Sequence, residues 1–75
     1  MQFSLNEPEK INLDVYNCEG KLVRRLIAGN KVSSGKFTVV WDARDGNGND
    51  LPIGSYFYFL VGMKTRSGGK IIIFK

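Results

Sequence analysis

Large apolar residues alternate with smaller or polar ones along much of the chain. From Phe37 to Trp41 every second residue is large and apolar, and the same spacing returns from Tyr56 to Leu60. A period of two predicts β-strands with one buried face. The run 42–50 between them is rich in Asp, Asn and Gly, which favour turns. We therefore expect two long antiparallel strands joined by a loop, with Trp41 and Tyr56 meeting in the core.

The first part of the chain predicts three more strands. A short strand over 3–5 ends before Pro8, because proline has no backbone N–H to donate. The segment 11–15 alternates most regularly, and a turn at 17–20 leads into a strand over 21–27. The apolar residues of that strand change parity midway, which indicates a bulge or a change of pairing partner.

Glycine-rich turns divide the rest of the chain. Residues 28–34 are expected to form a loop, with a brief strand at Lys31-Val32 as an alternative. Arg66-Ser67-Gly68-Gly69 is interpreted as the turn of a last hairpin before a strand over 70–74. Closely spaced strands without helical periodicity predict an all-β fold, a small antiparallel β-sandwich of about seven strands. Its centre is expected to contain Val15, Val39, Trp41, Tyr56, Tyr58 and Leu60.

The strand over 56–61 is apolar on both faces. Phe57, Phe59 and Val61 point to the side opposite Tyr56 and Leu60. In a two-layer sandwich only one face is core, so the second set is either an apolar surface patch or a face covered by the curl of a short chain. A patch would receive a neighbouring domain or a second copy of the chain. Phe57 and Phe59 are therefore candidate partner-contact residues.

Composition indicates one small folded domain over residues 1–75. Hydrophobic residues make up 43% of the chain and aromatic residues 12%, which suits a packed core and not a disordered chain. The longest apolar run, 71–74, is far too short to cross a membrane, so no membrane insertion is expected. No signal peptide is visible. The chain is then either intracellular or the C-terminal module of a larger exported protein, and we favour the second.

The residue types exclude the common catalytic and metal sites. The chain has no His and one cysteine, Cys18, which excludes histidine-activated nucleophiles and the usual zinc spacings. The run from Asp45 resembles a calcium loop, but Asp50 stands where that loop needs glycine, and Tyr56 where it needs glutamate. Turn chemistry explains the run better. We expect no enzyme activity, no catalytic residue, no cofactor and no metal.

Positive charge gathers in the last part of the chain. The net charge is +4, and no acidic residue follows Asp50. Nucleic-acid binding is not expected, because the aromatic strand over 56–59 contains no basic residue. The late basic residues either attract an anionic partner or protect a sheet edge from pairing. They join the candidate partner-contact residues: Lys64, Arg66, Lys70 and Lys75.

The order of the motifs resembles one family of domains. In sequence they are Leu13-Asp14-Val15-Tyr16-Asn17, Val23-Arg24-Arg25-Leu26, Phe37-Thr38-Val39-Val40-Trp41-Asp42, Asp45-Gly46-Asn47-Gly48, Leu51-Pro52-Ile53-Gly54-Ser55-Tyr56 and Lys70-Ile71-Ile72-Ile73. This order is similar to the immunoglobulin-like domain of the flagellar hook-capping protein and to the C-terminal sorting domains of the type IX secretion system. Ala43 departs from the pattern, because glycine commonly follows Trp-Asp there.

The resemblance implies an immunoglobulin-like β-sandwich without catalytic residues. It implies an accessory or sorting module of an exported bacterial protein, located outside the cell or at the cell surface. Such a module acts by protein–protein contact, with export machinery or a neighbouring domain as partner. The alternative is a structural subunit that self-associates with like subunits through edge strands, into a filament or hook-type assembly.

Overall fold

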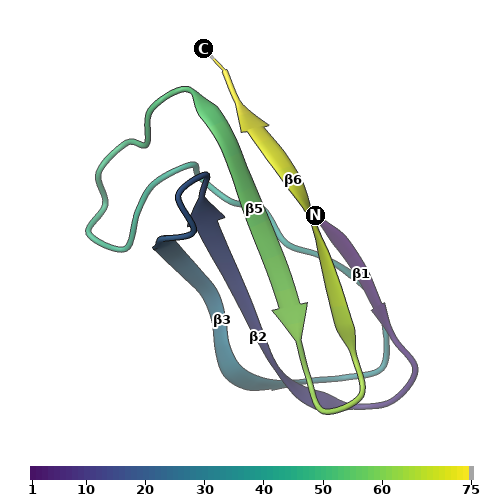
Figure 1. The fold of residues 1–75 in the computed structure, drawn as a ribbon. Helices are drawn as coiled ribbons and strands as arrows, with labels where there is room; N and C mark the ends of the chain where they lie inside the picture. Colours follow the sequence, from purple (N-terminus) through teal and green to yellow (C-terminus); the bar gives the residue numbers. More distant parts are fainter. Residues whose placement is uncertain (75) are drawn as a thin grey trace.

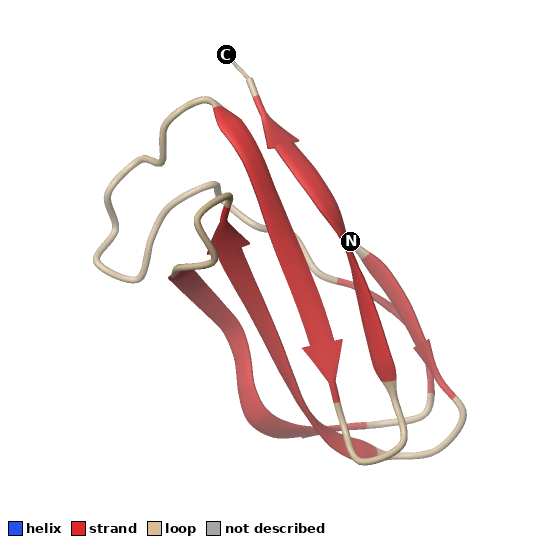
Figure 2. Cartoon of the chain, in the orientation of Figure 1, coloured by secondary structure: helices blue, strands red, loops and turns tan. Residues whose placement is uncertain are grey.

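The computed structural model describes residues 1–74, which form six β-strands and no helix (Figure 1, Figure 2). In chain order the strands are β1 (Gln2–Leu5), β2 (Glu9–Asn17), β3 (Leu22–Val32), β4 (Gly35–Thr38), β5 (Gly54–Val61) and β6 (Arg66–Ile73). Every strand pairs antiparallel with its neighbours. Over these residues there is no helix long and apolar enough to span a membrane.

The strands form two layers. β3, β2, β5 and β6 lie side by side in that order as a four-stranded sheet, and β1 pairs with β4 in a second, two-stranded sheet (Figure 1). Apolar side chains of β1 pack against those of β2 and β5, so the core lies between the two sheets. This arrangement confirms the predicted all-β antiparallel sandwich, with six strands in residues 1–74 instead of about seven.

The central strand β2 provides the middle of the core. Ile11, Leu13 and Val15 alternate along it and are each 0% exposed, because β3 and β5 flank β2 and the second layer covers its inner face. Leu60 of β5 packs beside them. The predicted centre is confirmed for Val15, Tyr56 and Leu60, which are buried. It is wrong for Val39, Trp41 and Tyr58, which are only partly buried and pack against the core.

Trp41 contacts Tyr56 as predicted, but it does not lie on a strand. The two rings meet edge to face, with their centroids 5.9 Å apart. The predicted long strand is wrong because β4 ends at Thr38, which pairs with Gln2 of β1. One further pair of backbone hydrogen bonds joins Val39 to Met1, and the chain is irregular from there. The irregular chain that follows still packs onto the core through Val39, Trp41, Ala43 and Leu51.

β3 is longer than predicted. It continues through the expected loop 28–34 as far as Val32, which pairs with Glu9. Of the two predicted alternatives, a bulge or a change of partner, register shifts between β3 and β2 confirm the bulge, one of them between Leu13 and Asp14. These shifts let the strand bend. The loop prediction is wrong because pairing with the long β2 outweighs the polar composition of this segment.

The last hairpin turns earlier than predicted. The backbone N–H of Gly62 donates to the carbonyl of Thr65 at 2.7 Å, which closes a tight turn before β6. Glu9, at the start of β2, holds this turn in place. Its carboxylate accepts hydrogen bonds from the Lys64 N–H at 2.8 Å and from the Thr65 hydroxyl.

The glycine pair predicted to form a turn lies inside β6. Gly68 and Gly69 pair with Phe59 and Tyr58 of β5. A Cβ atom on Gly68 would lie 3.1 Å from the Phe59 ring, and one on Gly69 would lie 2.6 Å from the Tyr58 hydroxyl oxygen. The missing side chains therefore leave room for two aromatic rings on opposite faces of the sheet, an arrangement known as aromatic rescue of strand glycines.

Candidate interaction surface

One face of the four-stranded sheet points away from the second layer. Side chains alternate along a strand, so the residues between Tyr56, Tyr58 and Leu60 point outward from β5. Residues that pair directly across neighbouring strands share a face, which extends this set onto β2 and β6. We define the outer face by these outward side chains: Asn12, Asp14 and Tyr16 of β2, Ser55, Phe57, Phe59 and Val61 of β5, and Arg66, Lys70 and Ile72 of β6.

The centre of the outer face is apolar and exposed. The exposed fractions are 36% for Phe57, 49% for Phe59 and 40% for Val61. Tyr16 and Phe59 meet edge to face with ring centroids 5.7 Å apart. A hollow of about 520 Å³ extends from these side chains to the β2–β3 turn at Cys18. Of the two arrangements expected for this strand, the structure therefore shows the apolar surface patch.

Positive charge lies along one side of the outer face. Arg66 is opposite Val61 in the β5–β6 ladder, and Lys70 is opposite Phe57. Near the opposite edge of the sheet, the Arg25 Nε of β3 donates to Asp14 Oδ1 at 2.8 Å. The sheet therefore has a basic edge at β6, while the charge of Arg25 near the β3 edge is neutralised.

Most of the predicted contact residues come together on the outer face, namely Phe57, Phe59, Arg66 and Lys70. Lys64 lies apart in the β5–β6 turn, where its Nζ contacts Glu7 Oε1 at 2.8 Å. Lys75 lies outside the described residues. Tyr16 and Ile72 were missed, because their place beside the aromatic strand depends on strand register, which alternation alone does not fix.

The loop before β5 is held by its own hydrogen bonds. Asp45 Oδ1 accepts from the backbone N–H groups of Asn47 and Asn49, both at 2.9 Å, and the Asn49 bond is the main reason that the pKa of Asp45 is lowered. Arg24 donates to Asp42 Oδ1 at 3.2 Å. These bonds confirm the turn interpretation. In residues 1–74, no three His, Cys or acidic side chains are grouped so that they could hold a metal ion.

Glu9 is a buried carboxylate, with 7% of its surface exposed. The hydrogen bond from the Thr65 hydroxyl, followed by that from the Lys64 N–H, lowers the pKa of Glu9. Both donors belong to the β5–β6 turn. The group therefore ties two distant parts of the chain together, which is a structural role.

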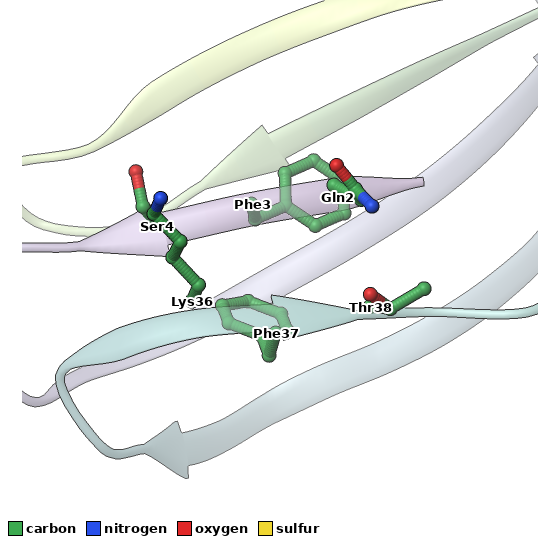
Figure 3. A pocket seen from close by; sticks show the side chains of 6 residues that line it. All are labelled: Gln2, Phe3, Ser4, Lys36, Phe37 and Thr38. Carbon is green, nitrogen blue, oxygen red and sulfur yellow. The ribbon is translucent and has the colours of Figure 1, made fainter.

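A second hollow, of about 290 Å³, lies against the two-stranded sheet. Its lining consists of Gln2, Phe3, Ser4, Lys36, Phe37 and Thr38 (Figure 3). The Phe3 and Phe37 rings lie 5.5 Å apart and pack with the core. Lys36 is the one titratable side chain among these six residues. The lining thus contains neither a nucleophile with an adjacent base nor a pair of carboxylates, and it offers no catalytic arrangement.

The chain matches a known family over most of its length. A family model described as "FlgD Ig-like domain" matches residues 1–65. The chain belongs to the FlgD Ig-like domain family. Among solved structures, FlgD from P. aeruginosa is similar to this FlgD Ig-like domain over 95% of the chain, with a TM-score of 0.72 and 22% sequence identity. The chain spans 54% of that protein. A comparison with curated proteins gave no match.

The family explains the Pro-x-Gly-x-Tyr spacing noted in the sequence. Tyr56 Oη donates to the Pro52 carbonyl at 2.8 Å. A tyrosine whose hydroxyl bonds the backbone a few residues upstream, the tyrosine corner, is typical of immunoglobulin-like sandwiches. The FlgD match confirms the resemblance to the immunoglobulin-like domain of the hook-capping protein. It gives no support to the sorting branch, which stays a prediction.

Proposed function

We propose that this FlgD Ig-like domain is a structural module of a hook-type assembly outside the cell membrane, where it works through protein–protein contact. Two observations support this role. The family match covers residues 1–65, and the four-stranded sheet leaves an apolar outer face uncovered. The second observation carries the proposal, because it says how a module without catalytic groups can act.

The outer face has the properties of an interface. Phe57 and Phe59 are neighbours on one rigid strand and are 36% and 49% exposed. Contiguous apolar surface rimmed by charged residues marks protein interaction sites, and aromatic residues and arginine are enriched at such sites. Arg66 and Lys70 supply the charged rim. A partner that covers the two rings would therefore gain apolar burial without refolding this domain.

The test is the double variant Phe57→Ser, Phe59→Ser in the full-length protein of the bacterium that encodes it. We expect the variant protein to fold, since both side chains point out of the core, and the strain to lose hooks in electron micrographs and motility in soft agar. The matched control is Val40→Ser, which removes an apolar side chain that is 87% exposed away from the outer face. Normal hooks in the double variant would contradict the proposal.

The sorting role remains the second candidate, now with less support than the structural one. It predicts that the chain, fused to the end of a periplasmic carrier, brings the carrier to the surface of a bacterium that has the type IX machinery. Retention of the fusion inside the cell, together with loss of hooks in the double variant, would decide for the structural role.

A further inference from the structure

The strands at the sheet edges carry no acidic residue. The edge strands are β1 and β4 in one sheet, and β3 and β6 in the other. All four contain only neutral and basic residues. The acidic residues lie instead on the central strand β2 and in loops and turns. An edge of this domain therefore offers positive charge, or none, to any strand that approaches it.

The β3 edge is partly occupied by the chain itself. Gly46 N donates to the Val23 carbonyl at 3.1 Å, so the loop before β5 covers part of the edge backbone. Two of the three cations of β3 are also paired, Arg24 with Asp42 at 3.2 Å and Arg25 with Asp14 at 2.8 Å. The third, Lys31, lies near the far end of the strand, opposite Lys10 of β2. The first half of this edge therefore has little left to offer a partner.

The β6 edge differs from the β3 edge both in the coverage of its backbone and in the pairing of its cations. Its ladder has β5 on one side, and residues 1–74 place no second strand on the other side. Arg66 and Lys70 make no ion pair with any carboxylate in that range. Unpaired strand backbone is a template for strand addition, and here two cations without partners stand beside it.

The outward residues of this edge form a defined row. Arg66, Gly68 and Lys70 occupy alternate positions on the outer face. Because Gly68 has no side chain, the ring of Phe59 lies close to its backbone. A strand added beyond β6 would thus meet a cation, an open aromatic surface and a second cation at successive outward positions.

We propose that the β6 edge binds an extended acidic segment of a different protein, which adds to the sheet as a fifth strand. One carboxylate lies opposite Arg66 and another opposite Lys70, and an aromatic side chain between them lies over Gly68 against Phe59. The inference rests on the proposed function, since it identifies the chemistry of the partner and the edge that receives it.

A second copy of this chain does not fit the site. None of its edge strands supplies a carboxylate, and pairing β6 with β6 would bring cations of both copies to one seam. Like charges opposite each other destabilise a sheet. The occupant is therefore a different polypeptide.

The test uses a fluorescent peptide, Thr-Glu-Thr-Phe-Thr-Glu-Thr, titrated with the 75-residue chain. Its core reads the same in both directions, so the test does not depend on strand orientation. We expect saturable binding in fluorescence anisotropy and new hydrogen-exchange protection of β6 amides. A peptide with lysine in place of both glutamates should bind at least about tenfold more weakly, because two attractive cross-strand pairs become repulsive.

Two controls separate strand addition from charge attraction. A peptide with proline in place of the inner threonines keeps both carboxylates but cannot form the ladder, and it should lose binding. The variant Arg66→Glu, Lys70→Glu should prefer the lysine peptide, whereas the matched variant Lys21→Glu, Lys36→Glu should keep the original preference. Equal binding of the proline peptide, or displacement by single-stranded DNA of equal charge, would overturn the proposal.

The two proposals fail in different ways. A strain that carries Arg66→Glu, Lys70→Glu and assembles normal hooks, while Phe57→Ser, Phe59→Ser abolishes them, would leave the structural role standing and overturn the acidic partner. Normal hooks in both strains, with specific peptide binding in solution, would leave the β6 edge standing and overturn the hook role.

Discussion

Ala43 is in a backbone conformation that its side chain disfavours. Its φ is 60°, in the left-handed region, where a Cβ atom costs about 1–2 kcal/mol. The conformation is imposed from outside: the Leu51 N–H donates to the Ala43 carbonyl at 3.1 Å, and the methyl group packs against the cluster around Val15 and Tyr56. The departure from the family pattern noted in the sequence is therefore a site of local strain.

Ala43→Gly should stabilise the domain. Removal of the strain outweighs the lost methyl contact and the extra freedom of the unfolded chain, for a net gain of up to about 1 kcal/mol. Urea unfolding monitored by Trp41 fluorescence measures the change. The matched control, Ala28→Gly on β3, has no strain to relieve and should destabilise by about 0.5–1 kcal/mol. A loss of stability in Ala43→Gly as large as in the control would contradict the account.

Glu9 makes stability depend on acid pH. Its folded pKa lies below the ordinary value of 4.5, so its contribution is present above pH 4.5 and is lost as the pH falls through the folded pKa. Glu9→Gln should therefore be less stable than wild type at neutral pH and should lose less stability between neutral and acid pH. Unfolding free energies across this range test it. Glu19→Gln, at an exposed turn position, should keep the wild-type slope, and an unchanged slope in Glu9→Gln would refute the role.

At the scale of the element, β6 shows how neighbours override local preference. Adjacent glycines favour a turn by propensity, yet Gly68 and Gly69 continue a strand because the rings of β5 need the space. Tyr58 is held in turn by Phe3, edge to face, with centroids 5.8 Å apart. A methyl group at Gly69 therefore cannot be accommodated by free rotation of the tyrosine.

Gly69→Ala should destabilise the domain by about 1–2 kcal/mol, since overpacking against Tyr58 exceeds the gain in strand propensity. Thermal or urea unfolding measures this. The control is Gly46→Ala, where a Cβ atom meets nothing within 4 Å, and its stability should change by no more than about 0.5 kcal/mol. Equal stability of the two variants would mean that the Tyr58 ring does not lie over β6.

Trp41 belongs to the irregular part of the second layer, and its removal should reflect this. A fully buried tryptophan costs about 3–5 kcal/mol when replaced by alanine. Because Trp41 is partly buried, contacts Tyr56 and donates from Nε1 to the Arg44 carbonyl at 3.1 Å, we expect a loss of about 2–3 kcal/mol for Trp41→Ala. Val40→Ala, at an exposed neighbour, should change little. A loss near zero would place the indole outside the core.

The sequence predicts well the elements whose pattern is set by burial. β2 alternates strictly because it is central, and the two faces of β5 follow from parity alone, so Phe57 and Phe59 could be assigned to one face. Whether that face is exposed or covered depends on the second layer, which parity does not place. The misplaced turn and the early end of β4 depend on which residues lie opposite in space. Gly68 is indistinguishable from a turn residue until Phe59 is placed beside it, and the end of β4 depends on its pairing with β1.

At the scale of the whole molecule, the positive charge of the exposed β6 edge disfavours pairing with the same edge of a second copy. β6 presents Arg66 and Lys70 on the outer face, and basic residues on an edge discourage pairing between copies. The apolar outer face, taken alone, would favour association. Arg66 and Lys70, at the border of the patch, therefore oppose the self-association that the apolar face would favour.

Arg66→Gln, Lys70→Gln should increase self-association of the isolated chain. Sedimentation velocity at increasing concentration is expected to show dimers or larger species for this variant at concentrations where wild type is monomeric. Lys21→Gln, Lys36→Gln lowers the net charge equally and should behave as wild type. An increase of the same size in both variants would mean that net charge, and not the β6 edge, controls association.

The contact between Glu9 and Thr65 has a consequence for biosynthesis, since the two residues are 56 positions apart. A ribosome delivers the carboxylate early and its hydroxyl donor late. Until the later residue has left the exit tunnel, the nascent amino-terminal strands contain an anion whose final partners do not yet exist. Such distant pairing is slow to form, and the domain can adopt its mature shape only after Thr65 has emerged from the ribosome.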